Sequence, residues 1–243
     1  MKYFLVALQF LTIFPCPERD GCSADELSRS ALFFPVVGLL LGLILVSVNI
    51  VLQPFASAGL LSVVLVTLLA LMTRGLHLDG LADTFDGFGG SRDRERTLKI
   101  MNDSHTGAFG LTAIVLLLSF KIHALESIDG ERWRALLGAP VLGRWSMVLL
   151  GYHAKAVQTG LAAQLIHHMQ GKQVVFASLM TFVIVVSLLR NTGLALMIWV
   201  AVFSLASRKF FHHRLGGLNG DIFGAVGEIS EASVLVLLAM TTR

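Results

Sequence analysis

Residues 30–73 form a stretch of 44 residues that contains no Asp, Glu, Lys or Arg. About 20 apolar residues cross a bilayer once as a helix, so this stretch is long enough for two crossings joined by a turn. Only 14% of the 243 residues are charged, against about 25% in an average soluble domain. A large soluble core does not account for these features, and the sequence predicts an integral membrane protein.

Hydropathy along the chain predicts an all-α, polytopic helical bundle with about seven transmembrane helices. The apolar residues 2–14 precede Pro-Cys-Pro in place of a small-residue cleavage site, so we expect an interfacial or re-entrant N-terminal helix there. No repeat or linker is apparent, and residues 1–243 are predicted to form one membrane-embedded catalytic domain. The predicted spans are residues 33–52, 57–73, 107–124, 135–151, 174–189, 192–207 and 222–241.

The basic residues are unevenly distributed between the predicted loops. With the N-terminus inside, the inner segments hold thirteen Lys and Arg residues and the outer segments hold four. Because cytoplasmic loops carry an excess of Lys and Arg, this predicts a cytoplasmic N-terminus and an external C-terminus. The same bias accounts for the net charge of +3, so the lipid bilayer is the expected partner and nucleic acid is not.

Acidic residues are concentrated in one segment, since six of the sixteen lie between Arg74 and Gly110. Asp79, Asp83 and Asp86 stand at i, i+4 and i+7, which places three carboxylates on one face of a helix. Like charges at this spacing repel unless a cation lies among them. Carboxylates suit hard cations, and Mg²⁺ binds one or two of them together with substrate phosphates. The segment therefore predicts a divalent-metal site, with helix capping by solvated Asp residues as the competing interpretation.

A second polar segment precedes the last predicted span. Asn219 and Asp221 lie in a glycine-rich stretch that enters this span, and Glu228 follows Asp221 on the same helix face. Carboxylates inside a membrane are costly and usually functional, although a Glu paired between helices is the structural alternative. The charge distribution puts this segment and the segment 79–103 on the cytoplasmic side, so one site can draw on both.

Other polar residues are candidates for phosphate contacts or proton transfer. Arg144 lies within the fourth predicted span, where an Arg either binds phosphate or pairs with a carboxylate. His77 is a candidate acid, base or ligand, and Asp103 is a candidate base or a helix cap. The backbone N–H groups of Gly107 and Gly110 offer an anion site at a helix start. The remaining substrate-binding candidates are Arg92, Arg94, Lys99, Ser104, His105 and Asn219.

Three motifs together resemble a known family. They are Gly-Leu-His-Leu-Asp-Gly-Leu-Ala-Asp-Thr-Phe-Asp-Gly (75–87), Asp-Arg-Glu-Arg-Thr-Leu-Lys-Ile-Met-Asn-Asp-Ser-His-Thr-Gly (93–107) and Gly-Leu-Asn-Gly-Asp-Ile-Phe-Gly-Ala-Val-Gly-Glu (217–228). With residues 10–15 and 29–38, they resemble the cobalamin synthase family, also called adenosylcobinamide-GDP ribazoletransferase. The resemblance covers nearly the whole chain.

The resemblance implies a multi-pass enzyme of the bacterial inner membrane whose active site faces the cytoplasm. Enzymes of this family join adenosylcobinamide-GDP to α-ribazole or its 5′-phosphate, require Mg²⁺ and release GMP, at the last stage of cobalamin nucleotide-loop assembly. A homo-oligomer and an association with other cobalamin-pathway enzymes both stay open.

The residues and the resemblance together suggest roles within the site. We expect Asp79, Asp83 and Asp86 to hold Mg²⁺ at the diphosphate, while Asp86, Asp103 or His77 takes the proton of the acceptor hydroxyl. Asp221 and Glu228 are candidates for a second metal or for substrate amides, and Arg92, Arg94, Lys99 and Arg144 are candidates for phosphate.

Two other classes of function compete with this interpretation. A CDP-alcohol phosphatidyltransferase uses a similar Asp-Gly-x-x-Asp theme, but the Ala-Arg pair and the long Asp-rich tail of that motif are missing. A cation-coupled transporter would use Asp79, Asp83, Asp221 and Glu228 as an ion site near the middle of the membrane.

Overall fold

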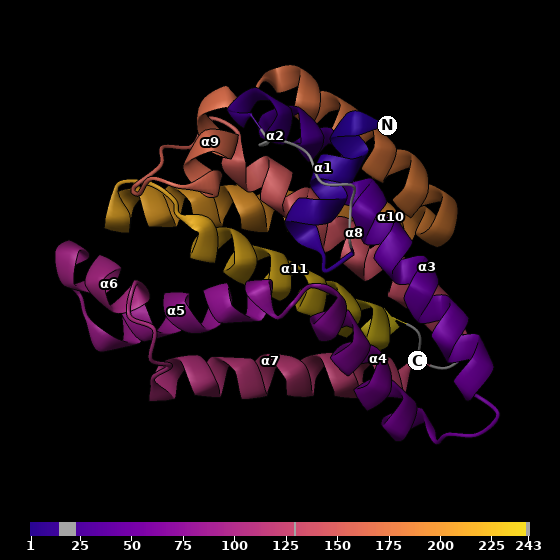
Figure 1. Cartoon of the computed structure of the whole chain (residues 1–243). Coiled ribbons are helices and arrows are strands. Elements are labelled where there is room, and N and C mark those ends of the chain that lie inside the picture. The colour runs from indigo at the N-terminus through magenta and orange to yellow at the C-terminus, as the bar shows by residue number, and fades with distance from the viewer. Residues whose placement is uncertain (15–22, 129, 242–243) are drawn as a thin grey trace.

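The computed structural model describes residues 1–14, 23–128 and 130–241 (Figure 1). Regular structure in these ranges is helical apart from one isolated bridge between Ala156 and Leu218, which agrees with the predicted all-α class. The helices are α1 (Lys2–Leu11), α2 (Ala24–Ser30), the short 3₁₀ helix η1 (Ala31–Phe33), α3 (Phe34–Leu52), α4 (Ala58–Met72), α5 (Leu76–Gly90), α6 (Arg94–Met101), α7 (Ala108–Ser127), α8 (Arg132–Gly151), α9 (Leu161–His168), α10 (Gly171–Leu215) and α11 (Gly220–Thr241).

Each of the seven predicted spans falls on a helix: α3, α4, α7, α8, the two halves of α10, and α11. The halves of α10 meet at Arg190, whose φ of 52° and ψ of −129° are not helical. Among the described residues, four helices are long and apolar enough to cross a membrane, namely Ala24–Leu52, α7, α10 and α11, and the bent pair α4–α5 makes a fifth candidate. The protein is therefore a polytopic helical membrane protein, while the count of seven crossings and the side of each loop stay predictions. Arg19 and Arg243, which entered the charge count, lie outside the described residues.

The N-terminal helix α1 is apolar but has only ten residues, so it is too short to cross a bilayer. Val6, Ala7 and Leu11 are its buried residues, and the following Ile13 donates a backbone hydrogen bond of 2.8 Å to the carbonyl of Met72 at the end of α4. A short helix tied to the end of a longer one agrees with the expected interfacial position, which itself stays a prediction.

A sharp turn between α4 and α5 redirects the chain at the start of the acidic segment. The two helices are bent by 89°, and Arg74 and Gly75 between them both have positive φ, 57° and 65°. Gly75 adopts this left-handed conformation without the steric cost that a side chain brings. As a result, α5 does not continue α4 but runs beside α7 and crosses α11 (Figure 1).

Helices α5 and α11 touch through their backbones at two glycines. A Cβ atom added to Gly80 of α5 would lie 2.7 Å from the carbonyl oxygen of Asp221, and one added to Gly224 of α11 would lie 3.0 Å from the backbone of His77. Small residues allow helices in a membrane to approach this closely. The first turns of α11 are therefore held against the acidic half of α5.

Four buried charged residues join α7, α8 and α11, and we call them the ion quartet. Lys121 of α7 donates to Glu228 at 2.5 Å and to Glu231 at 2.6 Å, both on α11, and Arg144 of α8 forms an ion pair with Glu231. All four side chains are almost inaccessible, with 6% exposure at most. Two cations and two anions neutralise each other, which is the condition under which charges are tolerated away from water.

We predict that Glu231→Gln strongly destabilises the protein, because it leaves Lys121 and Arg144 buried with a single counterion. Breaking a buried ion pair from one side costs about 3–5 kcal/mol. The measurement is unfolding of the detergent-solubilised protein by heat or denaturant. The matched control is Glu131→Gln, which breaks the exposed pair between Glu131 and Arg134 and is expected to cost about 1 kcal/mol or less. Equal stability of the two variants would contradict a structural role for the quartet.

Candidate active site

Asp79, Asp83 and Asp221 gather where α5 meets α11, and we call them the acidic cluster. The charged groups that act most strongly on Asp83 are Asp221, Asp79 and Asp86, and Asp79 acts in turn on Asp221. Asp79 is exposed, while Asp83 and Asp221 are half-buried. This juxtaposition of two distant segments agrees with the expectation that both contribute to one site.

The acidic cluster has no basic partner in the part of the chain that the structure describes: no ion pair there involves Asp79, Asp83 or Asp221. Nor do three or more His, Cys, Asp or Glu side chains of the described residues converge into a complete metal-binding group. Mg²⁺ does not require one, because it usually binds one or two carboxylates and fills its remaining positions with water and phosphate oxygens. An all-oxygen cluster without a counterion therefore fits a hard cation that arrives with its substrate.

Asp86 takes a different role from its two neighbours on the helix. Its carboxylate accepts hydrogen bonds from the backbone N–H groups of Gly107, at 2.6 Å, and Gly110, at 2.9 Å. N–H groups at the start of a helix have no carbonyl partner within the helix, so Asp86 supplies one for α7. A carboxylate at this position also complements the helix dipole. The helix-capping interpretation therefore holds for Asp86. The N–H groups of Gly107 and Gly110 thus bind an anion, as predicted, but this anion is the protein's own carboxylate and not a substrate. The roles of Asp86 as metal ligand and base lose support for the same reason.

Hydrogen bonds hold Asp221 in place. Asn219 donates from Nδ2 to Asp221 Oδ2 at 2.7 Å and to Gln158 Oε1 at 3.3 Å, while its Oδ1 accepts from the backbone N–H of Ile222. Gln158 in turn donates to Asn102 Oδ1 at 3.0 Å. Asn219, predicted to bind substrate, thus positions a carboxylate. Sequence reasoning missed Gln158, which stands in an irregular segment with no motif to mark it.

The structure corrects two further predicted site residues. Glu228 and Arg144 belong to the ion quartet, where Glu228 pairs with Lys121 and Arg144 pairs with Glu231. Glu228 therefore pairs with a cation and is not part of the acidic cluster. Arg144 pairs with a carboxylate, which is the structural alternative to binding phosphate. Lys121 and Glu231 were not singled out from the sequence, although a charged residue inside an apolar span is the signal that finds them.

His77 lies between the acidic cluster and the ion quartet. Its side chain is 4% exposed, and the charges that act on it are those of Arg144, Glu231 and Lys121. It also lines a cavity together with Asp79 and Asp221, so its predicted role as acid, base or ligand stays a prediction.

The loop between α6 and α7 exposes Asp103, Ser104 and His105. His105 donates from its ring nitrogen at 2.6 Å and from its backbone N–H at 3.0 Å to Asp103 Oδ1. The pKa of Asp103 lies below its ordinary value, since these bonds stabilise the carboxylate. A carboxylate with a lowered pKa is a weaker base, which argues against Asp103 as the proton acceptor.

The basic candidates of the α6 region are exposed. Arg92, Arg94 and Lys99 all lie at the surface, and a Cβ atom added to Gly216 would lie 3.1 Å from Nη2 of Arg94. Arg94 therefore approaches the loop that leads into α11. Contacts of these three residues, and of Ser104 and His105, with substrate stay predictions.

A cavity of about 300 Å³ opens beside the acidic cluster, and we call it the α9 cavity because α9 supplies one wall. Asp79 and Asp221 line it, together with residues of α1, α3, α8, α9 and the segment before α9. Volume and lining are within the range of small-molecule sites, which are mostly apolar with a few polar groups.

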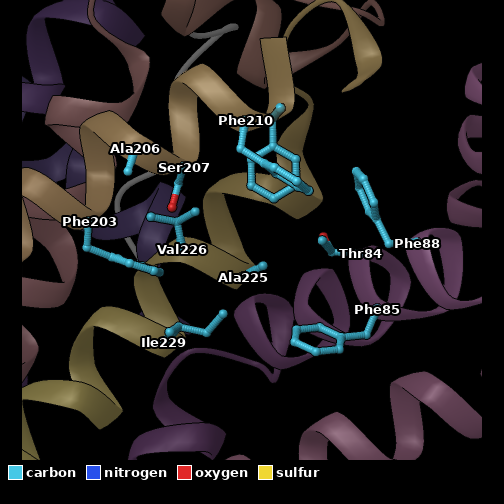
Figure 2. A pocket seen from close by; sticks show the side chains of 11 residues that line it. Thr84, Phe85, Phe88, Phe203, Ala206, Ser207, Phe210, Ala225, Val226 and Ile229 are labelled. Carbon is cyan, nitrogen blue, oxygen red and sulfur yellow. The ribbon is translucent and has the colours of Figure 1, made fainter. Parts of the chain in front are cut away.

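A second pocket, of about 420 Å³, is lined by the C-terminal half of α5 with α10 and α11 and has a different character. Among the described residues that line it, Thr84 and Ser207 alone carry side-chain hydrogen-bonding groups, and the rest of the lining is apolar. Figure 2 shows Thr84, Phe85 and Phe88 of α5 on one side, and Phe203, Ala206, Ser207 and Phe210 of α10 with Ala225, Val226 and Ile229 of α11 on the other.

The chain is similar to known proteins over nearly its whole length. Residues 3–239 match the family model described as "CobS: Cobalamin-5-phosphate synthase". Proteins named adenosylcobinamide-GDP ribazoletransferase include one from Geotalea daltonii, 38% identical over 98% of this chain and 97% of its own length. One from Syntrophobacter fumaroxidans is 39% identical over 96% of each chain, and one from Pseudomonas syringae is 39% identical over 99% of this chain and 100% of its own. No solved structure matches. Because the family model and these relatives cover nearly the whole length, the chain belongs to the cobalamin-5-phosphate synthase (CobS) family.

Proposed function

We propose that this protein is an adenosylcobinamide-GDP ribazoletransferase of the bacterial inner membrane, with its active site open to the cytoplasm. It transfers the cobinamide phosphoryl group to α-ribazole or its 5′-phosphate and releases GMP. Full-length relatives carry this name. The observation on which the proposal rests most is the acidic cluster at the α5–α11 contact, beside a cavity.

Asp79, Asp83 and Asp221 would hold Mg²⁺ at the diphosphate of the donor. When bound, the metal supplies neutralisation of the negative charge on the diphosphate and on the departing GMP. The close contact at Gly80 and the bond from Asn219 keep Asp221 beside the two carboxylates of α5. Such prior positioning is what phosphoryl transfer chiefly demands of a protein.

In the reaction, a ribose hydroxyl oxygen of the acceptor attacks the cobinamide-side phosphorus in line with the GMP oxygen. A new P–O bond forms, the P–O bond to GMP breaks, and the hydroxyl proton passes to a base. The base we favour is the carboxylate oxygen of Asp79 that the metal would leave free, because Asp79 is exposed and lines the α9 cavity. The oxygens of Asp86 are engaged at α7, and the low pKa of Asp103 weakens it as a base.

No observation favours the two competing classes. An ion-coupled transporter would gather its carboxylates in the middle of spans, but Asp79 is exposed, Asp221 lies in the first turn of α11 and Glu228 is paired with Lys121. Incubation of the purified protein with adenosylcobinamide-GDP, α-ribazole and Mg²⁺ tests the proposal directly. Mass spectrometry should find GMP and adenosylcobalamin, and their absence would overturn it.

Asp83→Asn should lower turnover by about 10²–10³-fold, because it removes one charge from the centre of the acidic cluster. The folded protein should remain in the membrane, since the Asn side chain has the same size. Initial rates of GMP release measure the effect, and Asp25→Asn, at a carboxylate paired with Arg29 away from the cluster, serves as the control. Near-normal turnover of Asp83→Asn would remove this residue from the site.

Chelation of divalent metal should abolish GMP release, and added Mg²⁺ should restore it, because three neighbouring carboxylates cannot accept a diphosphate without a cation. Asp79→Asn and Asp221→Asn should each require more Mg²⁺ for half-maximal rate, and Asp79→Asn should also lower the maximal rate because an amide cannot act as the base, whereas Asp25→Asn should change neither. The measurement is a Mg²⁺ titration of initial rate. Full activity in excess chelator would exclude metal from the mechanism.

A further inference from the structure

Resting on the proposed function, in which Asp221 binds metal, we infer that Gln158 is a positioning residue for this carboxylate. Gln158 lies between α8 and α9, outside the three sequence motifs and outside the lining of the α9 cavity. Its side chain bonds the amides of Asn102 and Asn219, and Asn219 in turn bonds Asp221. We call Asn102, Gln158 and Asn219 the amide relay.

The hydrogen bonds of the amide relay all run in one direction. Gln158 Nε2 donates to Asn102 Oδ1 at 3.0 Å, and Gln158 Oε1 accepts from Asn219 Nδ2 at 3.3 Å. The same Nδ2 group donates to Asp221 Oδ2 at 2.7 Å. An amide carries its donor and its acceptor on different arms, so turning Gln158 over would set acceptor against acceptor at Asn102 and donor against donor at Asn219. The orientation of one amide therefore fixes that of the next.

Asn219 is the member of the relay that acts on α11. Its side chain belongs to a residue that is 3% exposed, and its Oδ1 accepts from the backbone N–H of Ile222 at 3.2 Å. The two hydrogens of Nδ2 have two acceptors, Asp221 Oδ2 and Gln158 Oε1. Without Gln158, one hydrogen of a buried amide has no acceptor, which is costly, and the amide can turn out of its place beside the carboxylate.

The backbone that carries Gln158 is held independently of its side chain. The N–H of Lys155 donates to Nε2 of His212 on α10 at 2.9 Å, and the carbonyl of Lys155 accepts from Leu218 at 2.7 Å. Val157, the residue before Gln158, donates to the carbonyl of Leu218 at 3.0 Å. Gln158 thus projects from a fixed support, and a substitution of its side chain leaves these backbone bonds in place.

The orientation of Asp221 matters because a carboxylate binds a cation well only when its oxygens face it. Side chains that hydrogen-bond to metal-binding groups hold them in that orientation, and their loss lowers metal affinity or activity by about 10–100-fold. The bond from Asn219 engages Oδ2 of Asp221, so Oδ1 is the oxygen left wholly available to a cation. Gln158 therefore contributes to the metal site without touching it.

Gln158→Met tests the inference, because methionine has a similar length but breaks both bonds of the relay. We expect the Mg²⁺ concentration for half-maximal rate to rise about tenfold, with the KM for α-ribazole little changed. Gln164→Met, at an exposed glutamine of α9, is the matched control and should change neither. Asn102→Leu, at the exposed end of the relay, should raise the Mg²⁺ requirement if Gln158→Met fails to fold. An unchanged Mg²⁺ requirement in a folded relay variant overturns the inference.

A double variant shows whether Gln158 acts through Asp221. In the Asp221→Asn background, Gln158→Met should raise the Mg²⁺ requirement little further, because the carboxylate that the relay orients is already gone. Two residues that act through one interaction have non-additive effects. A full tenfold rise in both backgrounds would mean that Gln158 acts independently of Asp221, and would contradict the positioning role.

Hydrogen exchange of the metal-free protein separates this inference from the proposed function, since it needs no turnover. The backbone N–H of Ile222 should exchange faster in Gln158→Met than in the wild type or Gln164→Met, because its acceptor is the side chain of Asn219. The N–H of Leu218, whose acceptor is a backbone carbonyl, should keep its rate. Unchanged exchange at Ile222, or equally faster exchange at Leu218, would contradict the relay even in a protein that releases GMP.

Discussion

The backbone contact between α5 and α11 determines where the chemistry of this protein can occur. It exists because Gly80 and Gly224 lack side chains at the crossing, and any Cβ atom there would meet the opposite backbone. The contact brings the start of α11, with Asp221, to the acidic face of α5. Without it, Asp79 and Asp83 would be two carboxylates on an isolated helix turn, and the α9 cavity would lose one of its walls.

The ion quartet fixes the position of α11 along its axis, beyond the point where α11 crosses α5. Glu228 and Glu231 lie one and two turns further along α11 than Gly224, and Lys121 and Arg144 bind them from α7 and α8. Four mutually neutralised charges in an apolar bundle specify one arrangement, since any slip of a helix would leave a charge without its partner. The carboxylates of α11 thus have two different roles. Asp221 lines a cavity, whereas Glu228 and Glu231 are buried against cations.

The regular spacing of Asp79, Asp83 and Asp86 conceals a similar division of roles. Asp79 and Asp83 remain beside Asp221, whereas Asp86 binds the free N–H groups at the start of α7. The cap fastens α7 to α5, and α7 carries Lys121 of the quartet. A carboxylate that looks like a third metal ligand in the sequence therefore connects the acidic cluster to the structure that supports it.

The sequence by itself determined the membrane class, the helical segments and the acidic stretch, because hydropathy and charge are local properties that persist in any fold. It also identified Asp79, Asp83 and Asp221 as candidates, and its motifs carried the family resemblance. Only the tertiary structure decided which candidates meet. In the sequence, Glu228, Arg144 and Asp86 are as well marked by their spacing and their apolar surroundings as the residues of the acidic cluster. Their partners lie on other helices: Lys121 pairs with Glu228, Glu231 with Arg144, and the N–H groups at the start of α7 with Asp86. The role of a carboxylate depends on the charged or polar group beside it. Helix packing brings that group from a segment far away in the sequence, so no local sequence pattern reveals it.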